Sequence, residues 1–533
     1  MKPDLSAVPP LHHNLATRAV VGDALTRTAA MFGDRTAVID ASGQVTYREL
    51  GRASDALARA LLAGGLDRQQ PVAMVTLNSW RMLAGYFACA KAALVAVPVN
   101  VALTPADIAW ILRDAGATVV IVDHALAGLL GEFLTDPPAG LRLVVIGDDP
   151  EAALPGRGAE SFDVLAAGEP GAPEVLIDDR DIVQCLYTSG TTANPKGVLT
   201  AHVSVLIGAM TNAMQIGHRW GADPSVLLDV LPLFHTTGLN TLVLPVLLTG
   251  GTVVVHAGFD PAAVLDAIER HAVTHVMFLP MMYRALIAAR GDAGPLPGVR
   301  TAVYAMAAMP TDLLAQVAVL FPSAAVILGS GQTEVVPATV LQWPEHQHTK
   351  PGSWGPAVPT VATAVLGPDD APVAPEASGE IAYRGPHVMA GYWNAPEANA
   401  AAFAGGWFHS GDIGHLDHEH VVWFTDRLKD VIKTGGENVS SVDVESVVAA
   451  APGVAECTIV GIADDRWGEA VCAVVVPADP AAADTLPDQV LAHARAHLAG
   501  FQVPKKVLVV DELPKTATGK VRKHLVRDRL TGT

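Results

Sequence analysis

The regular alternation of short apolar strands with helix-like segments is the feature that most constrains the fold of this chain. Residues 49–65 repeat apolar side chains at helical spacing, and an apolar strand follows over 72–77. Thr104 and Pro105 predict the N-cap and first residue of another helix. Further strands are predicted over 118–123, 252–256, 275–280, 300–306 and 324–330. This alternation is typical of parallel sheets covered by helices on both faces, in which ligands bind beyond the carboxyl ends of the strands.

The chain changes character towards its C-terminal end. From about residue 352 the strands become shorter and turns more frequent, and from about residue 430 a smaller segment shows its own alternation of strands and helices. Residues 426–439, which separate these parts, are dense in charge and glycine. Since 533 residues exceed a single core, we expect at least two domains, with a mobile C-terminal domain beginning near this charged segment.

Composition excludes several classes of function. The chain has 54 acidic and 35 basic residues, a net charge of −19, which argues against nucleic-acid binding and against a polybasic membrane anchor. Residues 1–14 lack the apolar stretch of a secretory signal, and the longest apolar candidate, 242–258, is interrupted by Pro245 and Gly250-Gly251. The four cysteines are widely scattered and form neither a disulfide framework nor a metal motif. We expect a reduced, cytoplasmic enzyme without a membrane span.

One polar loop interrupts this apolar pattern most clearly. Residues 186–202, LYTSGTTANPKGVLTAH, begin within the end of the apolar run 182–187. That run predicts a buried strand. The loop offers backbone N–H groups, hydroxyls and the ammonium of Lys196, which are the groups that bind a polyphosphate. Its spacing is not that of a Walker A loop. Taken alone, such a cluster after a strand is more often an ordinary surface turn.

Further polar groups stand at predicted strand ends or in turns. They are His235 at the end of the predicted strand LPLFH, the small-residue turn 306–310, Thr333-Glu334 at the end of GSGQTE, Asp412 in a predicted tight SGD turn, Arg427 in DRLKD, and Lys520 after a glycine. Each also has a structural interpretation: a satisfied core histidine, a helix cap, a common turn, a surface ion pair or a solvated tail.

Taken together and in order, these motifs are far more specific. The succession TSGTT-x2-PKG, LPLFH, GQTE, SGD, DRLKD and a final GK resembles the adenylate-forming superfamily, which includes acyl- and aryl-CoA synthetases, nonribosomal adenylation domains and beetle luciferases. The resemblance extends from about Thr46-Tyr47 to Lys523. It implies an α/β fold with a large N-terminal domain (1–428) of parallel sheets flanked by helices plus a small β-barrel-like subdomain. A small, mobile α+β C-terminal domain (429–533) would follow, with its hinge near Lys429.

The resemblance also implies a reaction in two steps. A carboxylate attacks the α-phosphate of Mg-ATP to give acyl-AMP and pyrophosphate, and the thiol of coenzyme A then displaces AMP to give a thioester. Lys520 would approach the carboxylate and the bridging oxygen, because two anions react only where cations neutralise the developing charge. Glu334 would hold Mg²⁺, a cation that prefers oxygen ligands, and Asp412 and Arg427 would bind the ribose.

The implied site residues fall into five sets. The nucleotide set is Thr188, Ser189, Gly190, Thr191, Thr192, Lys196, Ala307, Ala308, Ser330, Gly331, Gln332, Thr333, Asp412, Arg427, Lys433 and Lys520. The catalytic set is Lys520, Glu334, Thr333 and Lys433, the metal set is Thr188 and Glu334, and the hinge is Lys429. The acyl pocket is expected to be lined by His235, Thr236, Gly238, Met281, Met306, Met309 and Ser330.

Three departures from the family pattern concern the nucleotide and acyl pockets. Ala193 replaces a common glycine, so a positive φ is harder to adopt there. MAAMP (306–310) replaces the usual SGGAP, and Ser330 stands where an aromatic side chain commonly stacks on adenine. Loss of that stacking would weaken ATP binding by about 1 kcal/mol.

The acyl pocket set is apolar and rich in methionine, with no permanently charged side chain, which favours a medium-sized monocarboxylic acid with an alicyclic or aryl body. The sequence therefore predicts an AMP-forming acid–CoA ligase of fatty-acid or aryl-acid metabolism that uses ATP, Mg²⁺ and coenzyme A. Two alternatives stay open: transfer of the acyl group to a separate carrier protein, and a non-catalytic ligand-binding protein on the same scaffold. A homodimer also stays open.

Overall fold

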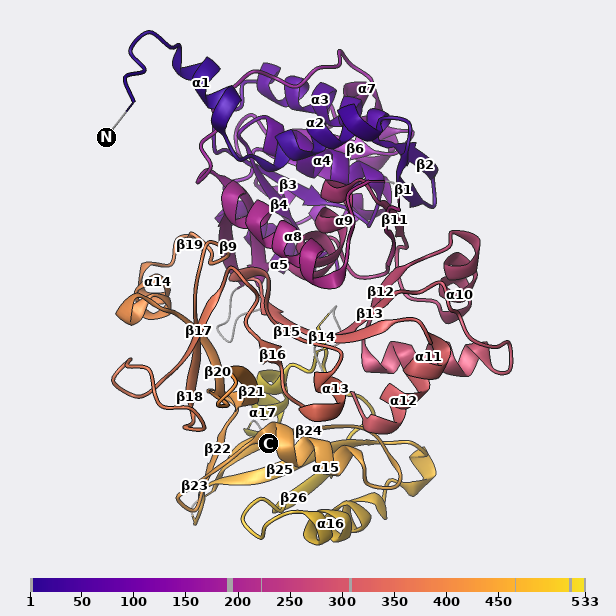
Figure 1. Cartoon of the computed structure of the whole chain (residues 1–533), viewed down its shortest axis with the longest axis vertical. Coiled ribbons are helices and arrows are strands. Elements are labelled where there is room, and N and C mark those ends of the chain that lie inside the picture. Colours follow the sequence, from indigo (N-terminus) through magenta and orange to yellow (C-terminus); the bar gives the residue numbers. More distant parts are fainter. Residues whose placement is uncertain are drawn as a thin grey trace. The chain divides into compact units, whose positions relative to one another are not determined.

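The computed structural model describes residues 3–188, 195–221, 223–305, 309–464, 466–516 and 520–531, without the side chains of Pro337 and Thr531. It divides into two compact units, one made of Met1–Ala362 with Tyr383–Phe403 and the other of Thr363–Ala382 with Ala404–Thr533 (Figure 1). The boundary at 428/429 expected from the sequence falls inside the second unit and stays a prediction. The four cysteines are free.

The first unit contains two mixed sheets of eight strands each. One has the order β19-β9-β8-β4-β3-β5-β6-β7, where the strands are β3 (Pro71–Val75), β4 (Val95–Pro98), β5 (Val119–Asp123), β6 (Arg142–Ile146), β7 (Glu160–Ser161), β8 (Ile182–Thr188), β9 (Lys196–Ala201) and β19 (Gly391–Tyr392). The other has the order β15-β14-β13-β12-β10-β11-β1-β2, with β1 (Thr36–Asp40), β2 (Gly43–Thr46), β10 (Val226–Asp229), β11 (Thr252–Val255), β12 (His275–Phe278), β13 (Thr301–Tyr304), β14 (Ala325–Gln332) and β15 (Val335–Gln342).

The central pairs of both sheets are parallel, as the alternation of strands and helices predicts. Antiparallel pairs occur where β9 joins β8 and where β15 joins β14. Helix α2 (Val21–Phe32) precedes β1, and further helices connect the strands (Figure 1): α3 (Tyr47–Ala63), α4 (Trp80–Lys91), α5 (Pro105–Asp114), α8 (His202–Ile216), α9 (Leu244–Thr249), α10 (Pro261–Arg270), α11 (Pro280–Arg290) and α12 (Thr311–Leu320). Short helices also lie at α1 (Pro10–Thr17), α6 (Pro150–Ala153), α7 (Phe162–Ala166), α13 (His346–Thr349) and α14 (Pro396–Ala402).

Local sequence signals explain where several of these helices begin. Thr46 and Glu49 form a reciprocal capping box at the start of α3. Thr104 caps α5 and Pro105 occupies its first position, as predicted. The apolar face of α5, with Ile108 and Ile111, packs into a buried cluster with residues of β3, β4 and β5. Burial of this continuous apolar surface is the main force that holds the helix on the sheet.

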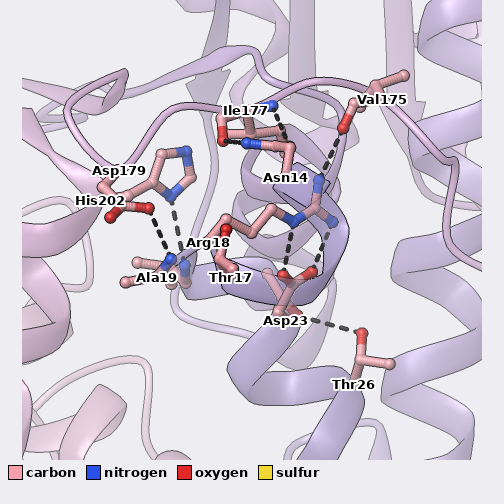
Figure 2. Close-up of polar contacts among 12 residues, drawn as sticks. Asn14, Thr17, Arg18, Ala19, Asp23, Thr26, Val175, Ile177, Asp179 and His202 are labelled. Atoms are coloured by element: carbon pink, nitrogen blue, oxygen red, sulfur yellow. Dashed lines mark hydrogen bonds and ion pairs between the residues drawn. The ribbon is translucent and has the colours of Figure 1, made fainter. Parts of the chain in front are cut away.

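The N-terminal segment is fastened to the stretch that leads into β8 (Figure 2). Asn14 exchanges two hydrogen bonds with the backbone of Ile177, and the N–H of Ala19 donates to Asp179 at 2.6 Å. Arg18 forms a two-pronged ion pair with Asp23, at 2.7 and 2.8 Å, and also donates to the backbone. The side-chain amide and guanidinium thus satisfy backbone groups that no strand partner reaches.

The second unit contains two smaller sheets. One includes β17 (Ala362–Leu366), β18 (Gly379–Arg384), β20 (Phe408–Leu416) and β21 (Val421–Arg427) in the order β21-β20-β18-β17. The other has the order β23-β22-β25-β24, with β22 (Ile432–Thr434), β23 (Glu437–Val439), β24 (Val454–Asp464) and β25 (Gly468–Pro477), and β26 (Lys506–Val509) beside β25. Three helices, α15 (Ser441–Ala449), α16 (Leu486–His497) and α17 (Lys523–Thr531), accompany the second sheet. The α/β fold class with a smaller C-terminal part is confirmed.

Two local predictions are wrong. The SGD motif is not a tight turn, because Asp412 lies within β20 and pairs with Arg427 of β21. The run LPLFH is not a strand, because β10 ends at Asp229 and the backbone then leaves the sheet. In both cases glycine and proline marked an irregularity of the backbone but not its type: Gly411 has a positive φ of 71° inside an irregular strand pair. In the part of the chain that the structure describes, no helix has the length and apolar character to cross a membrane.

Candidate active site

The two ends of the predicted phosphate loop lie side by side in the first unit. Strand β8 ends at Thr188 and β9 begins at Lys196, and these two residues are register partners in the antiparallel pair. The hydroxyl of Thr188 donates to the carbonyl of Lys196 at 3.4 Å. The predicted Ser189, Gly190, Thr191 and Thr192, and the departure at Ala193, lie outside the described residues. The hairpin thus holds one hydroxyl and one ammonium at the base of the loop.

The carboxylate predicted to hold the metal is oriented by a residue that the sequence analysis did not single out. Glu334 lies in the two-residue turn between β14 and β15, and its Oε1 accepts a hydrogen bond of 3.0 Å from the phenol of Tyr392. The ammonium of Lys196 lies 5.1 Å from the centroid of the same ring. Tyr392 therefore contacts two predicted site residues that are far apart in the sequence. The sequence feature that could have indicated Tyr392 is the aromatic pair after a glycine in GYW (391–393).

The oxygen donors of the predicted metal site suit a magnesium ion that is held by few protein ligands. Glu334 offers carboxylate oxygens and Thr188 a hydroxyl, and oxygen ligands are those that Mg²⁺ prefers. Over the described ranges, no group of three or more His, Cys, Asp or Glu side chains could hold a metal by itself. A site with so few protein ligands leaves most positions to phosphate oxygens and water, which is the usual arrangement for magnesium with a nucleotide.

The residues predicted around adenine lie on and beside β14. Ser330 and Gln332 pair with Val340 and Val335 of β15, and Thr339 donates to the carbonyl of Ser330 at 3.2 Å. Gly331 is exposed and Thr333 is buried. Ala307, Ala308 and Met306 lie outside the described residues.

The predicted acyl side is built from the irregular backbone after β10. Asn78 donates to the carbonyl of Leu231 at 2.8 Å and accepts from the N–H of Leu233 at 2.9 Å, which fixes the course of this segment. His235 follows, and its Nδ1 lies 3.0 Å from the hydroxyl of Thr237. At Gly238 a Cβ would lie 2.5 Å from a backbone carbonyl oxygen, so the close approach requires glycine.

Thr236 is buried, and its hydroxyl donates to Asn240 of the π-helical segment η3 (Thr237–Val243) at 3.0 Å. Because this hydroxyl is already used, Thr236 offers the acid no free donor. The predicted methionines lie on other elements: Met281 is 57% exposed at the start of α11, and Met309 is half-buried before α12.

Four predicted residues of the second unit come together. Asp412 is buried and its Oδ1 lies 2.7 Å from Nε of Arg427, which is half-buried. Loss of hydration lowers the pKa of Lys520 to about 8, with a further lowering from Arg427 and Lys429 that Asp412 and Asp430 oppose. Loss of hydration likewise lowers the pKa of Lys429. Three cations beside the carboxylates of Asp412 and Asp430 suit an anionic ligand that also carries hydroxyls.

Lys433 lies apart from this cluster, on the hairpin of β22 and β23. Its N–H donates to the carboxylate of Glu469 at 2.7 Å. The hairpin turns at Gly435-Gly436 with φ of 60° and 89°, and this conformation explains why two glycines stand there.

Comparison with known proteins identifies the family. The model of the AMP-binding enzyme family matches residues 25–393, which include Thr188, Lys196 and Glu334, and the model of the AMP-binding enzyme C-terminal domain matches residues 443–520. The chain belongs to the AMP-binding enzyme family. The resemblance to adenylate-forming enzymes expected from the motifs is thereby confirmed.

Relatives match over nearly the whole chain. It is 37% identical over 510 residues to a protein named feruloyl-CoA synthase from Amycolatopsis sp, covering 94% of this chain and 97% of the relative. It is 34% identical over 506 residues to indoleacetate–CoA ligase of Aromatoleum aromaticum, covering 94% and 96%. Among solved structures, O-succinylbenzoate coenzyme A synthetase from Bacillus subtilis, in complex with ATP and magnesium ion, matches with a TM-score of 0.81 and 28% identity, covering 95% of this chain and 99% of that chain.

Proposed function

We propose that this chain is an AMP-forming carboxylic acid–CoA ligase. The observation that carries the proposal is the convergence in the first unit: Lys196 and Glu334, predicted from separate motifs for phosphate and metal, contact one tyrosine. Membership of the AMP-binding enzyme family supports the binding of a nucleotide beside Lys196 and Glu334. The names of the relatives, a feruloyl-CoA synthase and an indoleacetate–CoA ligase, support coenzyme A as the acceptor.

The first step joins two anions, so the protein must neutralise both. Thr188 and Lys196 bind the β- and γ-phosphates, and Lys520 supplies a positive charge to the reacting carboxylate and the bridging oxygen. Glu334 holds Mg²⁺, which when bound would neutralise charge on the phosphate oxygens. The buried Asp412 accepts hydrogen bonds from the ribose hydroxyls, and Arg427 holds that carboxylate in place. Ser330, Gly331, Gln332, Thr333, Ala307 and Ala308 complete the nucleotide set.

In the second step the acyl group passes to the thiol of coenzyme A. Lys429 serves as the hinge of a C-terminal domain formed by residues 429–533, since a few residues suffice to absorb such a rotation. Lys433 and the Gly435-Gly436 turn belong to the hairpin that reorganises for thioester formation.

The acid is an apolar monocarboxylate with an aryl or alicyclic body. The described residues of the acyl set, His235, Thr236, Gly238, Met281, Met309 and Ser330, carry no permanent charge. The hydroxyl of Thr236 is already bonded within the protein, so the pocket favours an apolar body over a polar one. The two relatives are named for aryl acids, which supports the aryl choice.

A panel of aryl, alicyclic and short dicarboxylic acids tests this function. Purified protein with Mg-ATP should release pyrophosphate with aryl or alicyclic acids, and added coenzyme A should be consumed in equal amount. If acyl-AMP forms while a carrier protein but not free coenzyme A is acylated, the acceptor is the carrier. Acid binding by calorimetry without any binding of Mg-ATP would instead establish a non-catalytic protein.

A further inference from the structure

A short segment of the first unit joins the two large sheets at the predicted phosphate and metal residues. We define this segment, residues 387–393, as the splint. On one side its backbone bonds to the start of β15: Met389 N–H donates to the carbonyl of Glu334 at 2.8 Å, and the carbonyl of His387 accepts from Val336 at 3.1 Å. An isolated bridge between Val335 and Val388 lies between these bonds.

On its other side the splint pairs with β9, the strand that begins at Lys196. The N–H of Ala390 donates to Leu199 at 2.8 Å, and the N–H of Trp393 donates to Gly197 at 2.7 Å. Seven residues therefore fix the start of β9 relative to Glu334. These contacts connect the predicted phosphate residue Lys196 with the predicted metal residue Glu334. The two residues come from different sheets and from different sequence motifs.

The side chain of Tyr392 closes this connection. Its hydroxyl donates to Glu334 Oε1 at 3.0 Å, and its ring lies 5.1 Å from the ammonium of Lys196. Its own backbone is clamped by Asn399, which accepts from the Tyr392 N–H at 2.7 Å and donates to its carbonyl at 2.9 Å. The preceding Gly391 has a φ of 150°, and a Cβ there would lie 3.1 Å from the Asn399 side chain. A tyrosine held this firmly can orient the groups that it touches.

We propose that Tyr392 is a positioning residue that holds the Glu334 carboxylate and the Lys196 ammonium in the geometry that receives the metal and the phosphates. The proposal rests on the proposed function and deepens it. A donor bonded to a metal-binding carboxylate fixes the orientation of that carboxylate, and loss of such a partner typically weakens metal binding about 10–100-fold. The ring face attracts the ammonium and so restricts where Lys196 can place its charge.

Tyr392→Phe is the sharpest test, because it removes only the hydroxyl and keeps the ring beside Lys196. Magnesium is titrated into the protein with ATP present, and binding is followed by calorimetry and by the shift of the melting temperature. We expect the apparent Kd for magnesium to rise about tenfold, while the Kd for ATP without magnesium stays unchanged. Tyr392→Leu, which also removes the ring, should in addition weaken ATP binding without magnesium.

Trp393→Phe provides the matched control. Trp393 lies in the same splint and its Nε1 donates to the carbonyl of Asp114 at 2.8 Å, so the change removes one hydrogen bond outside the predicted site. This variant should keep the wild-type affinity for magnesium. In a Glu334→Ala background, the effect of Tyr392→Phe should disappear, because the tyrosine hydroxyl acts through that carboxylate.

Three results would overturn the inference alone, with the wild type still binding Mg-ATP: an unchanged magnesium affinity in Tyr392→Phe, an equal loss in Trp393→Phe, or an undiminished effect in the Glu334→Ala background. A wild-type protein that binds no Mg-ATP would overturn both this inference and the proposed function.

Discussion

Lys520 is the residue whose charge state controls the proposed first step. Loss of hydration and the neighbouring cations Arg427 and Lys429 lower its pKa to about 8, so the folded protein loses this charge at a pH where a free lysine would keep it. Lys196, another cation predicted to bind the phosphates, lies in the first unit.

The rate of acyl-AMP formation should therefore fall as the pH rises through about 8. The ammonium is present below its pKa and lost above it, so kcat/KM for ATP should decline towards tenfold per pH unit on the alkaline side. Pyrophosphate release measured from pH 6 to 10 gives this profile. Lys520→Arg keeps its charge over this range and should show no such decline, whatever its absolute rate. Identical profiles for the two proteins would show that another group titrates.

Asp229 is a second residue with an unusual environment. It lies fully buried at the end of β10, where its Oδ1 accepts from the N–H of Leu231 at 3.1 Å. Burial raises the pKa of its carboxyl to about 8, and the Leu231 hydrogen bond opposes that rise only in part. The carboxyl is therefore protonated in the folded protein at neutral pH and ionised in the unfolded chain.

This difference makes the stability of the first unit depend on pH. A folded-state pKa raised above the unfolded value contributes stability that is complete below about pH 4 and is lost as the pH rises to about 8. Asp229→Asn cannot ionise, so its free energy of unfolding should rise relative to the wild type as the pH increases from 5 to 8. Denaturant unfolding at several pH values measures this, and parallel curves for the two proteins would refute it.

At the scale of elements, a buried amide pair connects β8 with the segment that carries the acyl side. Gln184 of β8 and Asn240 of η3 exchange two hydrogen bonds of 3.0 Å each, and both are fully buried. Tyr86 of α4 donates to Gln184 at 2.9 Å, and Thr236 donates to Asn240. A buried network that is satisfied in this way fixes one arrangement of its elements, because any slip leaves polar groups unpaired.

Replacing both sides of this pair should cost less than the two single replacements added together. Asn240→Leu or Gln184→Met leaves a buried amide without its partner and should lower the free energy of unfolding by about 1–3 kcal/mol. The double variant should lose less than the sum of the two, by about 0.5–3 kcal/mol. Tyr86→Phe, which leaves the reciprocal pair intact, is the control and should lose about 1 kcal/mol. Chemical denaturation measures all four variants, and strictly additive losses would show that the pair is not coupled.

The elements themselves could be read from the sequence because their signals are local. The Thr104 cap and Pro105 start α5 where predicted, and the apolar periodicity of 49–65 matches α3 to within a few residues. The SGD and LPLFH motifs were assigned to the wrong backbone types, because glycine and proline indicate an irregularity without specifying which one.

Contacts between distant segments could not be predicted in the same way. Nothing local indicates that Tyr392 meets Glu334 and Lys196, or that Asn14 fastens the N-terminal segment at Ile177 (Figure 2). Such partners are set by the packing of whole sheets, for which a single sequence carries no periodic signal.

At the scale of the whole molecule, the central claim concerns two sources of positive charge in a chain with a net charge of −19. In the proposed function, Lys196 and the magnesium-binding carboxylate of Glu334 would come from the first unit, and Lys520 with its neighbour Arg427 would come from the second. Each set is small, so the proposed reaction between two anions should depend on both.

Exchange of labelled pyrophosphate into ATP, measured without coenzyme A, tests this claim most directly, because it isolates the reversible formation of acyl-AMP. The account predicts exchange that requires an aryl or alicyclic acid and magnesium. In Lys520→Ala the exchange should fall about 10²–10³-fold, with the melting temperature nearly unchanged because Lys520 is not part of an apolar core and its truncation leaves no core cavity. Exchange in Lys520→Ala at the wild-type rate, or no exchange with any acid of the panel, would contradict it.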